Sequence, residues 1–343
     1  MNKNKIVFFC VGTGGHVFPV INLIDDLIKI GIDKRKIDVI TDNRGSQYFK
    51  DKNISNHSMD IYRSKIGKIG YFLNIIKIIK SIRIIEKKID LENSKILFTT
   101  GSYVAPLAAY LSWKYKIKFF IQEQNIYAGL GNKIASYFKS VKFTSYPNTI
   151  NINQKNLVHT GPVVDKKIQN NKSNYNKEIT IGIQGGSQGS EEINSLIYRY
   201  LSNNTLKNIK IVHIVGPNNL DKSKKYENYK QVEFIENMDD FYSSINLQVS
   251  RAGGGVLEAV LSNIPLLLIP YKHGTTSSHQ SMNASFLVKS KLAKFCLNYE
   301  SLEFEFKKLE KLDNSLFDEF SKNNVIKKGN DFIVNKIIDE IDK

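Results

Sequence analysis

A chain of 343 residues suits two domains, because single hydrophobic cores rarely grow beyond ~250–300 residues. Apolar residues make up 41% of it, the mean hydropathy is -0.28, and no apolar run reaches the ~20 residues of a membrane-spanning helix. The formal charge of +16 suits phosphate-bearing ligands or anionic membrane surfaces, and no nucleic-acid-binding motif is present. Cys10 and Cys296 lack zinc-type spacing. We therefore expect a cytoplasmic two-domain protein that does not bind nucleic acid.

Short apolar runs alternate with amphipathic segments along the whole chain. In the first half we predict strands at 5–11, 36–41, 94–100, 117–122, 141–145 and 156–160, and helices at 16–30, 70–88, 103–115 and 129–139. In the second half we predict strands at 178–184, 209–215, 231–235, 246–250 and 265–269, and helices at 190–202, 237–244, 254–262, 279–289 and 300–312. This alternation indicates α/β domains on parallel sheets that are covered on both faces.

A polar segment rich in lysine and asparagine, 165–177, is the predicted linker. It divides the chain into an N-terminal domain, 1–164, and a C-terminal domain, 165–324. The last segment, about 325–343, is expected to form a helix that packs back on the N-terminal domain. Its apolar residues recur at helical spacing: Phe332, Ile333, Ile337, Ile338 and Ile341.

Two glycine-rich turns each follow a predicted strand and precede a predicted helix. The first is Gly12-Thr13-Gly14-Gly15-His16 and the second is Gly185-Gly186-Ser187-Gln188-Gly189. Such a turn brings backbone N–H groups to the start of a helix, where a phosphate can bind. Glycines also serve ordinary tight turns, so one turn alone is weak evidence. Their repetition predicts two similar domains that face one cleft.

Three strand ends in the first half carry candidate catalytic or binding residues. His16 follows the first glycine turn, where its imidazole acts as a general base, positions a ligand, or only donates a structural hydrogen bond at the helix entry. Tyr103 lies in the loop 101–106 after one predicted strand, and Glu123-Gln124-Asn125 follows the next. Carboxylate and amide groups at the carboxyl ends of parallel strands can hold sugar hydroxyls, and the alternative is a capped turn.

A third glycine-rich turn in the second half, Arg251-Ala252-Gly253-Gly254-Gly255, leads to Glu258. Its glycines would admit a ligand close to the helix start. Glu258 would then hold a ribose diol, unless it is an ordinary surface glutamate. Gln280 and Asn283 share one face of a predicted helix. No Asp-x-Asp triplet occurs, so we expect a diphosphate to be held by glycine turns and helix termini.

Residues 65–88 predict a basic amphipathic helix. Its apolar face consists of Ile75, Ile76, Ile79, Ile82 and Ile85, and its basic face of Lys77, Lys80, Arg83 and Lys87. Such a helix can lie on an anionic bilayer, and Trp113 is a candidate to join it. The alternative is a helix that packs its isoleucines into the core and exposes its lysines to solvent.

The segments 12–19, 123–125, 185–189 and 251–255 occur in this order and at suitable spacing. Together they resemble the MurG family of peptidoglycan N-acetylglucosaminyltransferases along nearly the whole chain. The resemblance implies a GT-B fold, with two Rossmann-like domains facing a central cleft. It implies transfer of GlcNAc from UDP-GlcNAc to the 4-hydroxyl of undecaprenyl-diphospho-MurNAc-pentapeptide, which converts lipid I into lipid II, with inversion and without a metal or other cofactor. It also implies a peripheral enzyme at the cytoplasmic face of the cell membrane.

The resemblance implies roles for individual residues as well. The sugar or diphosphate is approached by Thr13, Gly14, Gly15, Asn125 and Ser187. The uracil is contacted by Ile235, the ribose by Glu258 and the GlcNAc hydroxyls by Gln280. The N-terminal domain takes the lipid acceptor and the C-terminal domain takes UDP-GlcNAc, while the base is either His16 or Glu123.

Three positions depart from the family pattern. Val11 stands where the family usually has a glycine, and Val164 where a donor-binding arginine is common. The Arg251 turn is one residue shorter than usual and lacks its threonine. Three alternatives stay open at this point: a GT-B glycosyltransferase acting on another lipid such as diacylglycerol, a UDP-GlcNAc 2-epimerase, and an inactive membrane-bound scaffold.

Overall fold

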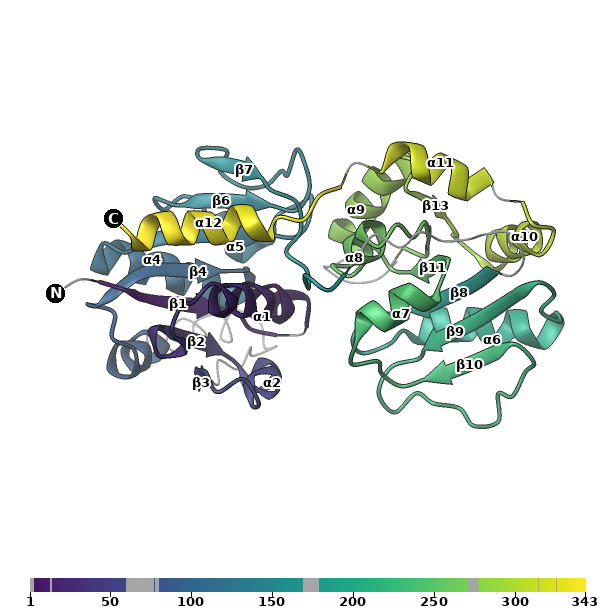
Figure 1. The fold of residues 1–343 in the computed structure, drawn as a ribbon, viewed down its shortest axis with the longest axis horizontal. Coiled ribbons are helices and arrows are strands. Elements are labelled where there is room, and N and C mark those ends of the chain that lie inside the picture. The colour runs from purple at the N-terminus through teal and green to yellow at the C-terminus, as the bar shows by residue number, and fades with distance from the viewer. Residues whose placement is uncertain are drawn as a thin grey trace. The chain divides into compact units, whose positions relative to one another are not determined.

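The computed structural model of the chain describes residues 3–12, 14–59, 77, 80–168, 179–270, 277–313, 315–324 and 326–343. It divides into two compact units (Figure 1). Unit 1 consists of Met1–Asp165 and Lys328–Lys343, and unit 2 of Lys166–Lys327. Thr13 and most of the predicted membrane helix, residues 65–76, 78 and 79, lie outside the described residues.

Within the described ranges, unit 1 is built on a parallel sheet of seven strands in the order β3-β2-β1-β4-β5-β6-β7. The strands are β1 (Lys5–Phe9), β2 (Ile37–Thr41), β3 (Ser55–Ser58), β4 (Ser94–Thr99), β5 (Lys118–Glu123), β6 (Val141–Thr144) and β7 (Leu157–His159). The α-helices are α1 (Gly14–Lys29), α2 (Asn43–Ser46), α4 (Ala105–Tyr115), α5 (Leu130–Ala135) and α12 (Asn330–Ile341). Short 3-10 helices are η1 (Lys34–Lys36), η2 (Gln47–Phe49) and η3 (Ser102–Val104), and residues 80–88 are also helical.

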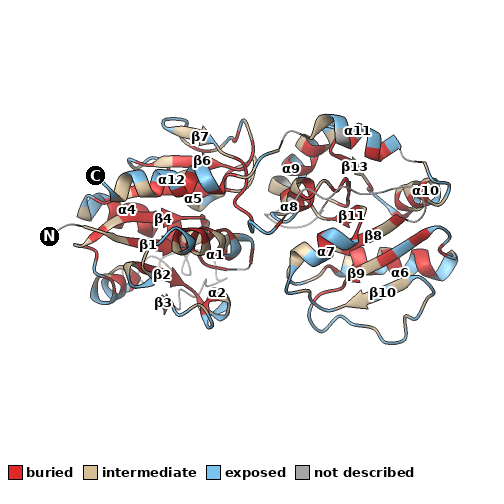
Figure 2. Cartoon of the chain, viewed as in Figure 1, coloured by how far each residue is buried: buried red, intermediate tan, exposed pale blue. Residues whose placement is uncertain are grey.

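The strand β1 shows why this sheet is covered on both faces. Ile6 and Phe8 belong to a core cluster with α1 and α12, whereas Val7 and Phe9 belong to a second cluster with α4. Successive side chains of a strand point to opposite faces, so an uninterrupted apolar run requires helices on both sides. Figure 2 shows the buried strands between these layers. Ile333 and Ile337 of α12 are buried in the first cluster, and Ile338 and Ile341 pack against it half-buried, which places the C-terminal helix against the core of unit 1.

The described part of the predicted basic helix packs against unit 1. Ile85 is buried in the core, whereas Ile84 remains 44% exposed. Glu86 forms an ion pair with Lys114 of α4, at 2.6 Å. Core packing therefore accounts for part of the apolar face. No helix in the described ranges is both long enough and apolar enough to cross a bilayer.

Unit 2, within the described ranges, is built on a parallel sheet of six strands in the order β10-β9-β8-β11-β12-β13. The strands are β8 (Ile179–Gln184), β9 (Ile209–Ile214), β10 (Tyr229–Val232), β11 (Leu247–Ser250), β12 (Leu266–Leu268) and β13 (Ala293–Phe295). The helices are α6 (Glu191–Asn203), α7 (Met238–Ser244), α8 (Val256–Leu261), α9 (Ser277–Lys289), α10 (Tyr299–Glu310) and α11 (Ser315–Asn323). The isoleucines of β8 pack with apolar residues of α6 and α10.

The structure differs from the sequence prediction mainly at short and edge elements. The pattern does not predict β3, β13 or α11, and it predicts one helix at 103–115 where η3 precedes α4. β3 is a polar edge strand, so it lacks the apolar residues that mark a strand. α11 buries Leu316, Phe317 and Phe320. These apolar residues recur at helical spacing, so the sequence does contain a signal for this helix.

Each sheet contains one reversal in strand order, between β1 and β4 in unit 1 and between β8 and β11 in unit 2. At such a reversal the loops diverge to opposite faces and leave a crevice beyond the carboxyl ends of the strands. Open parallel sheets bind their ligands there. The candidate residues of each unit are therefore expected at one edge of one sheet.

Candidate active site

Two hydrogen bonds join the loops on either side of the reversal in unit 1. The Nδ1 of His16 donates to the carbonyl oxygen of Thr100, at 2.9 Å. The Thr100 hydroxyl donates in return to the carbonyl oxygen of His16, at 2.7 Å. A carbonyl only accepts, so Nδ1 carries the proton and Nε2 of the neutral imidazole carries the lone pair. The half-buried ring is thus held in a tautomer that suits a general base.

Glu123, the last residue of β5, organises the loop that follows it. Its Oε1 accepts from the backbone N–H groups of Gln124 and Asn125, both at 2.9 Å, and from the Asn125 side-chain amide at 3.1 Å. Its Oε2 accepts from the Gly129 N–H at 3.1 Å and from Asn132 Nδ2 at 2.9 Å. Both oxygens of this buried carboxylate are therefore engaged in the loop. This geometry favours His16 over Glu123 as the base and lets Glu123 position Asn125.

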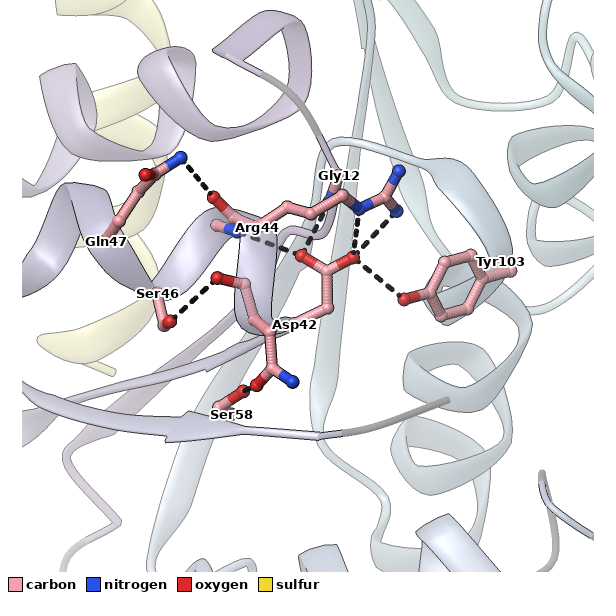
Figure 3. A network of polar contacts seen from close by, with 9 residues as sticks. Gly12, Asp42, Arg44, Ser46, Gln47, Ser58 and Tyr103 are labelled. Atoms are coloured by element: carbon pink, nitrogen blue, oxygen red, sulfur yellow. Dashed lines mark hydrogen bonds and ion pairs between the residues drawn. The ribbon is translucent and has the colours of Figure 1, made fainter. Parts of the chain in front are cut away.

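A buried carboxylate connects the first glycine turn to two neighbouring loops (Figure 3). Asp42 directly follows β2 and accepts from the Gly12 N–H at 3.1 Å, from Arg44 at 2.7 Å and from the Tyr103 hydroxyl at 3.2 Å. Burial alone would raise the pKa of Asp42, but the hydrogen bonds from Arg44, Gly12 and Gly45 outweigh it and keep that pKa below its usual value. Burial and the nearby Asp42 raise the pKa of Tyr103 to about 12, so Tyr103 stays a neutral donor.

The predicted residues of unit 1 thus meet at the carboxyl ends of four adjacent strands, β2, β1, β4 and β5. Gly14 begins α1, Gly15 is exposed on its first turn, and Asn125 is half-buried beside Glu123. Thr13 lies outside the described residues. Backbone N–H groups at the start of a helix as long as α1 form a suitable site for an anion.

The second glycine turn has the corresponding position in unit 2, between β8 and α6. It ends at Ser190, whose hydroxyl accepts from the Ile193 N–H at 3.3 Å and caps α6. Gly189 has a φ of 76°, and a Cβ atom there would overlap the carbonyl oxygen of Val215, so this position requires glycine. Ser187 is half-buried within the turn. The turn therefore presents its backbone at the positive end of a long helix.

Arg251 joins the third glycine turn to the cap of α6. Its Nε and Nη2 donate to the Ser190 hydroxyl at 3.1 and 2.6 Å, and Nη2 lies 3.6 Å from the Glu192 carboxylate. Asn283 is completely buried, and its amide donates to the carbonyl oxygen of Ala252 at 3.1 Å. We therefore expect Asn283 to support the turn rather than to contact a ligand directly.

The other predicted residues of unit 2 are accessible. Gly254 and Gly255 are exposed before α8, and Glu258 on α8 is half-buried. Ile235 is half-buried. It lies in the loop after β10, because that strand ends at Val232 and not at 235 as predicted. Gln280 on α9 has a buried Oε1 without a hydrogen-bond partner among the described residues. A ligand hydroxyl could satisfy this acceptor.

Sequence reasoning misses several residues that hold these sites. Asp42 and Thr100 directly follow strand segments. The rule that ligands bind at the carboxyl ends of parallel strands, which marks Glu123 as a candidate, therefore applies to them as well. Asn132 and Tyr242 lie in helices, where no local pattern marks their roles. Within the described ranges, no group of three or more histidine, cysteine, aspartate or glutamate side chains is placed to hold a metal ion.

Comparison with known proteins covers both units. Models of the glycosyltransferase family 28 N-terminal and C-terminal domains match residues 6–142 and 180–340. A UDP-N-acetylglucosamine–N-acetylmuramyl-(pentapeptide) pyrophosphoryl-undecaprenol N-acetylglucosamine transferase from Thermosipho africanus is 32% identical over 286 residues, 81% of this chain and 82% of its own. The transferase of the same name from Campylobacter jejuni is 29% identical over 340 residues, 95% of each chain.

Solved structures show the same architecture. The crystal structure of Acinetobacter baumannii MurG matches with a TM-score of 0.75 and 22% identity, covering 98% of this chain and 99% of that one. This match and the two parallel sheets confirm the predicted GT-B fold. Together with the identity to the Thermosipho africanus transferase, they show that the chain belongs to the MurG family, the UDP-N-acetylglucosamine–N-acetylmuramyl-(pentapeptide) pyrophosphoryl-undecaprenol N-acetylglucosamine transferases.

Proposed function

We propose that this hexosyltransferase moves GlcNAc from UDP-GlcNAc to the 4-hydroxyl of undecaprenyl-diphospho-MurNAc-pentapeptide, converting lipid I into lipid II for peptidoglycan synthesis. The observation that carries the proposal is 32% identity, over 81% of the chain, to a transferase named for these substrates. The glycine turns before α1 and α6 support it, because the N-terminus of a helix suits an anion. Transfer to another lipid, epimerisation of UDP-GlcNAc and an inactive scaffold are not favoured, since the curated relatives are named as transferases to the undecaprenol-linked acceptor.

Unit 2 supplies the donor site in this proposal. The turn 185–190 and the start of α6 receive the diphosphate, with Ser187 beside it, and Gly254 and Gly255 allow the nucleotide to approach closely. Ile235 contacts the uracil, and Glu258 holds the ribose. Gln280 accepts from a GlcNAc hydroxyl, which its buried Oε1 supports. The N–H groups of α6 stabilise the negative charge that develops on the departing UDP.

Unit 1 supplies the acceptor site and the base. The acceptor hydroxyl attacks the anomeric carbon of GlcNAc, the bond to UDP breaks, and His16 Nε2 takes the hydroxyl proton. One in-line displacement of this kind inverts the anomeric centre. Thr100 holds the imidazole in place, and Glu123 positions Asn125 toward the sugar or diphosphate. Tyr103 and the turn that contains Gly14 and Gly15 complete the acceptor side.

The proposal places the enzyme peripherally at the cytoplasmic face of the cell membrane, with about 65–88 against the anionic surface. Support comes from Lys80, Arg83 and Lys87, which are exposed, and from Trp113, which is 68% exposed on the neighbouring α4. An exposed tryptophan beside basic residues is typical of an interfacial surface.

Trp113→Ala is expected to lower binding to vesicles that contain phosphatidylglycerol by roughly tenfold, because the indole no longer enters the interface. Co-sedimentation measures this change. Phe304→Ala is the matched control, since Phe304 is an aromatic residue 61% exposed on unit 2. Equal binding by both variants would contradict the proposed membrane surface.

The reaction itself can be tested with purified protein, radiolabelled UDP-GlcNAc and a lipid I analogue. We expect label in the lipid-linked disaccharide. Binding of UDP-GlcNAc without transfer would indicate a different acceptor. Conversion of the free nucleotide sugar would indicate an epimerase, and absence of UDP-GlcNAc binding would indicate a scaffold.

A further inference from the structure

A buried tyrosine hydroxyl in unit 2 is directed at the proposed ribose-binding carboxylate. Tyr242 lies on α7 and has no exposed surface. Its hydroxyl donates to Oε2 of Glu258 at 3.1 Å and to the carbonyl oxygen of Gly255 at 3.3 Å. The hydroxyl has a single proton, which these two acceptors share. One buried atom therefore contacts both the glycine turn and the carboxylate.

This hydroxyl ends a line of polar side chains across the reversal in the sheet of unit 2. Gln184, at the end of β8, is near enough to the Tyr242 hydroxyl to act on its pKa, and its amide donates to Oε1 of Gln248 on β11, at 3.0 Å. Gln248 in turn donates to the Ser250 hydroxyl at 2.9 Å. In a buried network each bond restrains its neighbours, because an unpaired polar group in the interior is costly. The Tyr242 hydroxyl therefore lies beside a restrained polar pair and is held by its own bonds to Glu258 and Gly255.

The three glycines of this turn have few contacts of their own, whereas Arg251 and Ala252 before them are held by Ser190 and Asn283. Gly253, Gly254 and Gly255 carry no side chains, and the backbone hydrogen bonds from Val256 to Gly253 and from Ala259 to Gly255 are both long, at 3.4 Å. Burial and the charge of Glu258 keep the pKa of Tyr242 well above its usual value, so the hydroxyl retains its proton. Tyr242 can thus act as a permanent donor to the turn and to Glu258.

We propose that Tyr242 is a positioning residue that fixes the Glu258 carboxylate and the Gly255 carbonyl for the donor ribose, and so makes the enzyme selective for ribonucleotides over 2′-deoxyribonucleotides. The inference rests on the proposed function in one respect, because it takes Glu258 as the ribose-binding residue. A carboxylate held in one orientation can accept from both hydroxyls of a diol. An analogue that lacks one hydroxyl then leaves an acceptor unpaired, which is a strong basis for discrimination.

Tyr242→Phe tests this inference, because it removes one oxygen atom and retains the ring. We expect the KM for UDP-GlcNAc to rise about tenfold, in line with the loss of a hydrogen bond to a charged group, with kcat changed by less than about threefold. The preference for UDP over 2′-deoxy-UDP is expected to fall about tenfold toward unity. Steady-state kinetics measures the first effect, and calorimetric titration with the two nucleotides measures the second.

Tyr200→Phe is the matched control. Tyr200 is also completely buried in unit 2, and its hydroxyl donates to the carboxylate of Glu310 at 3.2 Å. It lies near the end of α6, which runs back to the amino ends of the strands. We expect Tyr200→Phe to lower the melting temperature about as much as Tyr242→Phe does, and to leave KM and nucleotide preference unchanged.

A double substitution separates positioning from general stability. If Tyr242 acts through Glu258, Tyr242→Phe should add little to the loss of preference that Glu258→Gln already causes. An unchanged preference in Tyr242→Phe, or no preference in the wild type, would overturn the inference. Nucleotide binding is measured without any acceptor, so a wild type that prefers UDP but transfers nothing to lipid I would contradict the proposed function and not this inference.

Discussion

Replacing His16 by asparagine is expected to lower the turnover of GlcNAc transfer by about 10²–10⁴-fold, the usual contribution of a general base. His16 Nδ1 is bound to the Thr100 carbonyl, so Nε2 is the nitrogen that remains for the substrate proton. An asparagine amide can still donate to Thr100 but offers no basic atom. Steady-state kinetics with a lipid I analogue measures the loss, and calorimetry is expected to show UDP affinity within about twofold of wild type.

Two further variants sharpen this test. His159 is exposed on β7 of the same unit, so His159→Asn is expected to leave turnover unchanged. His16→Ala also removes the bond to Thr100 and is expected to lower the free energy of unfolding by about 1 kcal/mol. A His16→Asn enzyme that retains wild-type turnover, or that loses turnover and UDP affinity equally, would exclude His16 as the base.

Replacing Glu123 by glutamine is expected to lower the free energy of unfolding of unit 1 by about 2–4 kcal/mol. Donors surround both carboxylate oxygens, so the glutamine NH₂ group meets N–H groups in either orientation. Thermal denaturation measures the loss. Amide hydrogen exchange over residues 124–132 is expected to rise, since the carboxylate holds the start and the end of this loop.

Glu86→Gln is the control for this substitution. Glu86 pairs with Lys114 and the Tyr115 hydroxyl near the surface of unit 1, where a glutamine oxygen can accept from the same partners. Its effect is expected to stay below about 1 kcal/mol. If Glu123→Gln instead kept wild-type stability and lost turnover about 100-fold, Glu123 and not His16 would be the base.

In both units the candidate site residues lie at the point where the strand order of the sheet reverses. In unit 1 the bond between His16 and Thr100 spans the reversal between β1 and β4. In unit 2 the bond between Gln184 and Gln248 spans the reversal between β8 and β11. Because the helices that follow these strands cover opposite faces, the loops between them stay open to a ligand. The placement of the candidate site residues therefore follows from strand order as much as from the residues themselves.

Local pattern sufficed for most of the fold. The apolar run of β1 between a basic start and the first glycine turn predicts a buried strand, and this strand lies inside its sheet, between β2 and β4. The same reasoning fails at β3, an edge strand of Ser55–Ser58, because an edge position needs no apolar run. It also misplaces β10, which is predicted at 231–235 and spans Tyr229–Val232, since strand ends depend on the partner strand.

The sequence by itself determined the α/β class, the two glycine turns and the family, because periodicity, turn chemistry and motif order are local properties of the chain. Only the tertiary structure decided what individual polar residues do. His16 bonds a residue 84 positions away, and Arg251 bonds one 61 positions away. The Asn283 amide likewise bonds the carbonyl oxygen of Ala252, and the Tyr242 hydroxyl bonds Glu258 on another helix. The physical reason is that a polar group bonds whichever partner the folded chain brings within reach. The spacing of residues along the sequence does not show which groups these are.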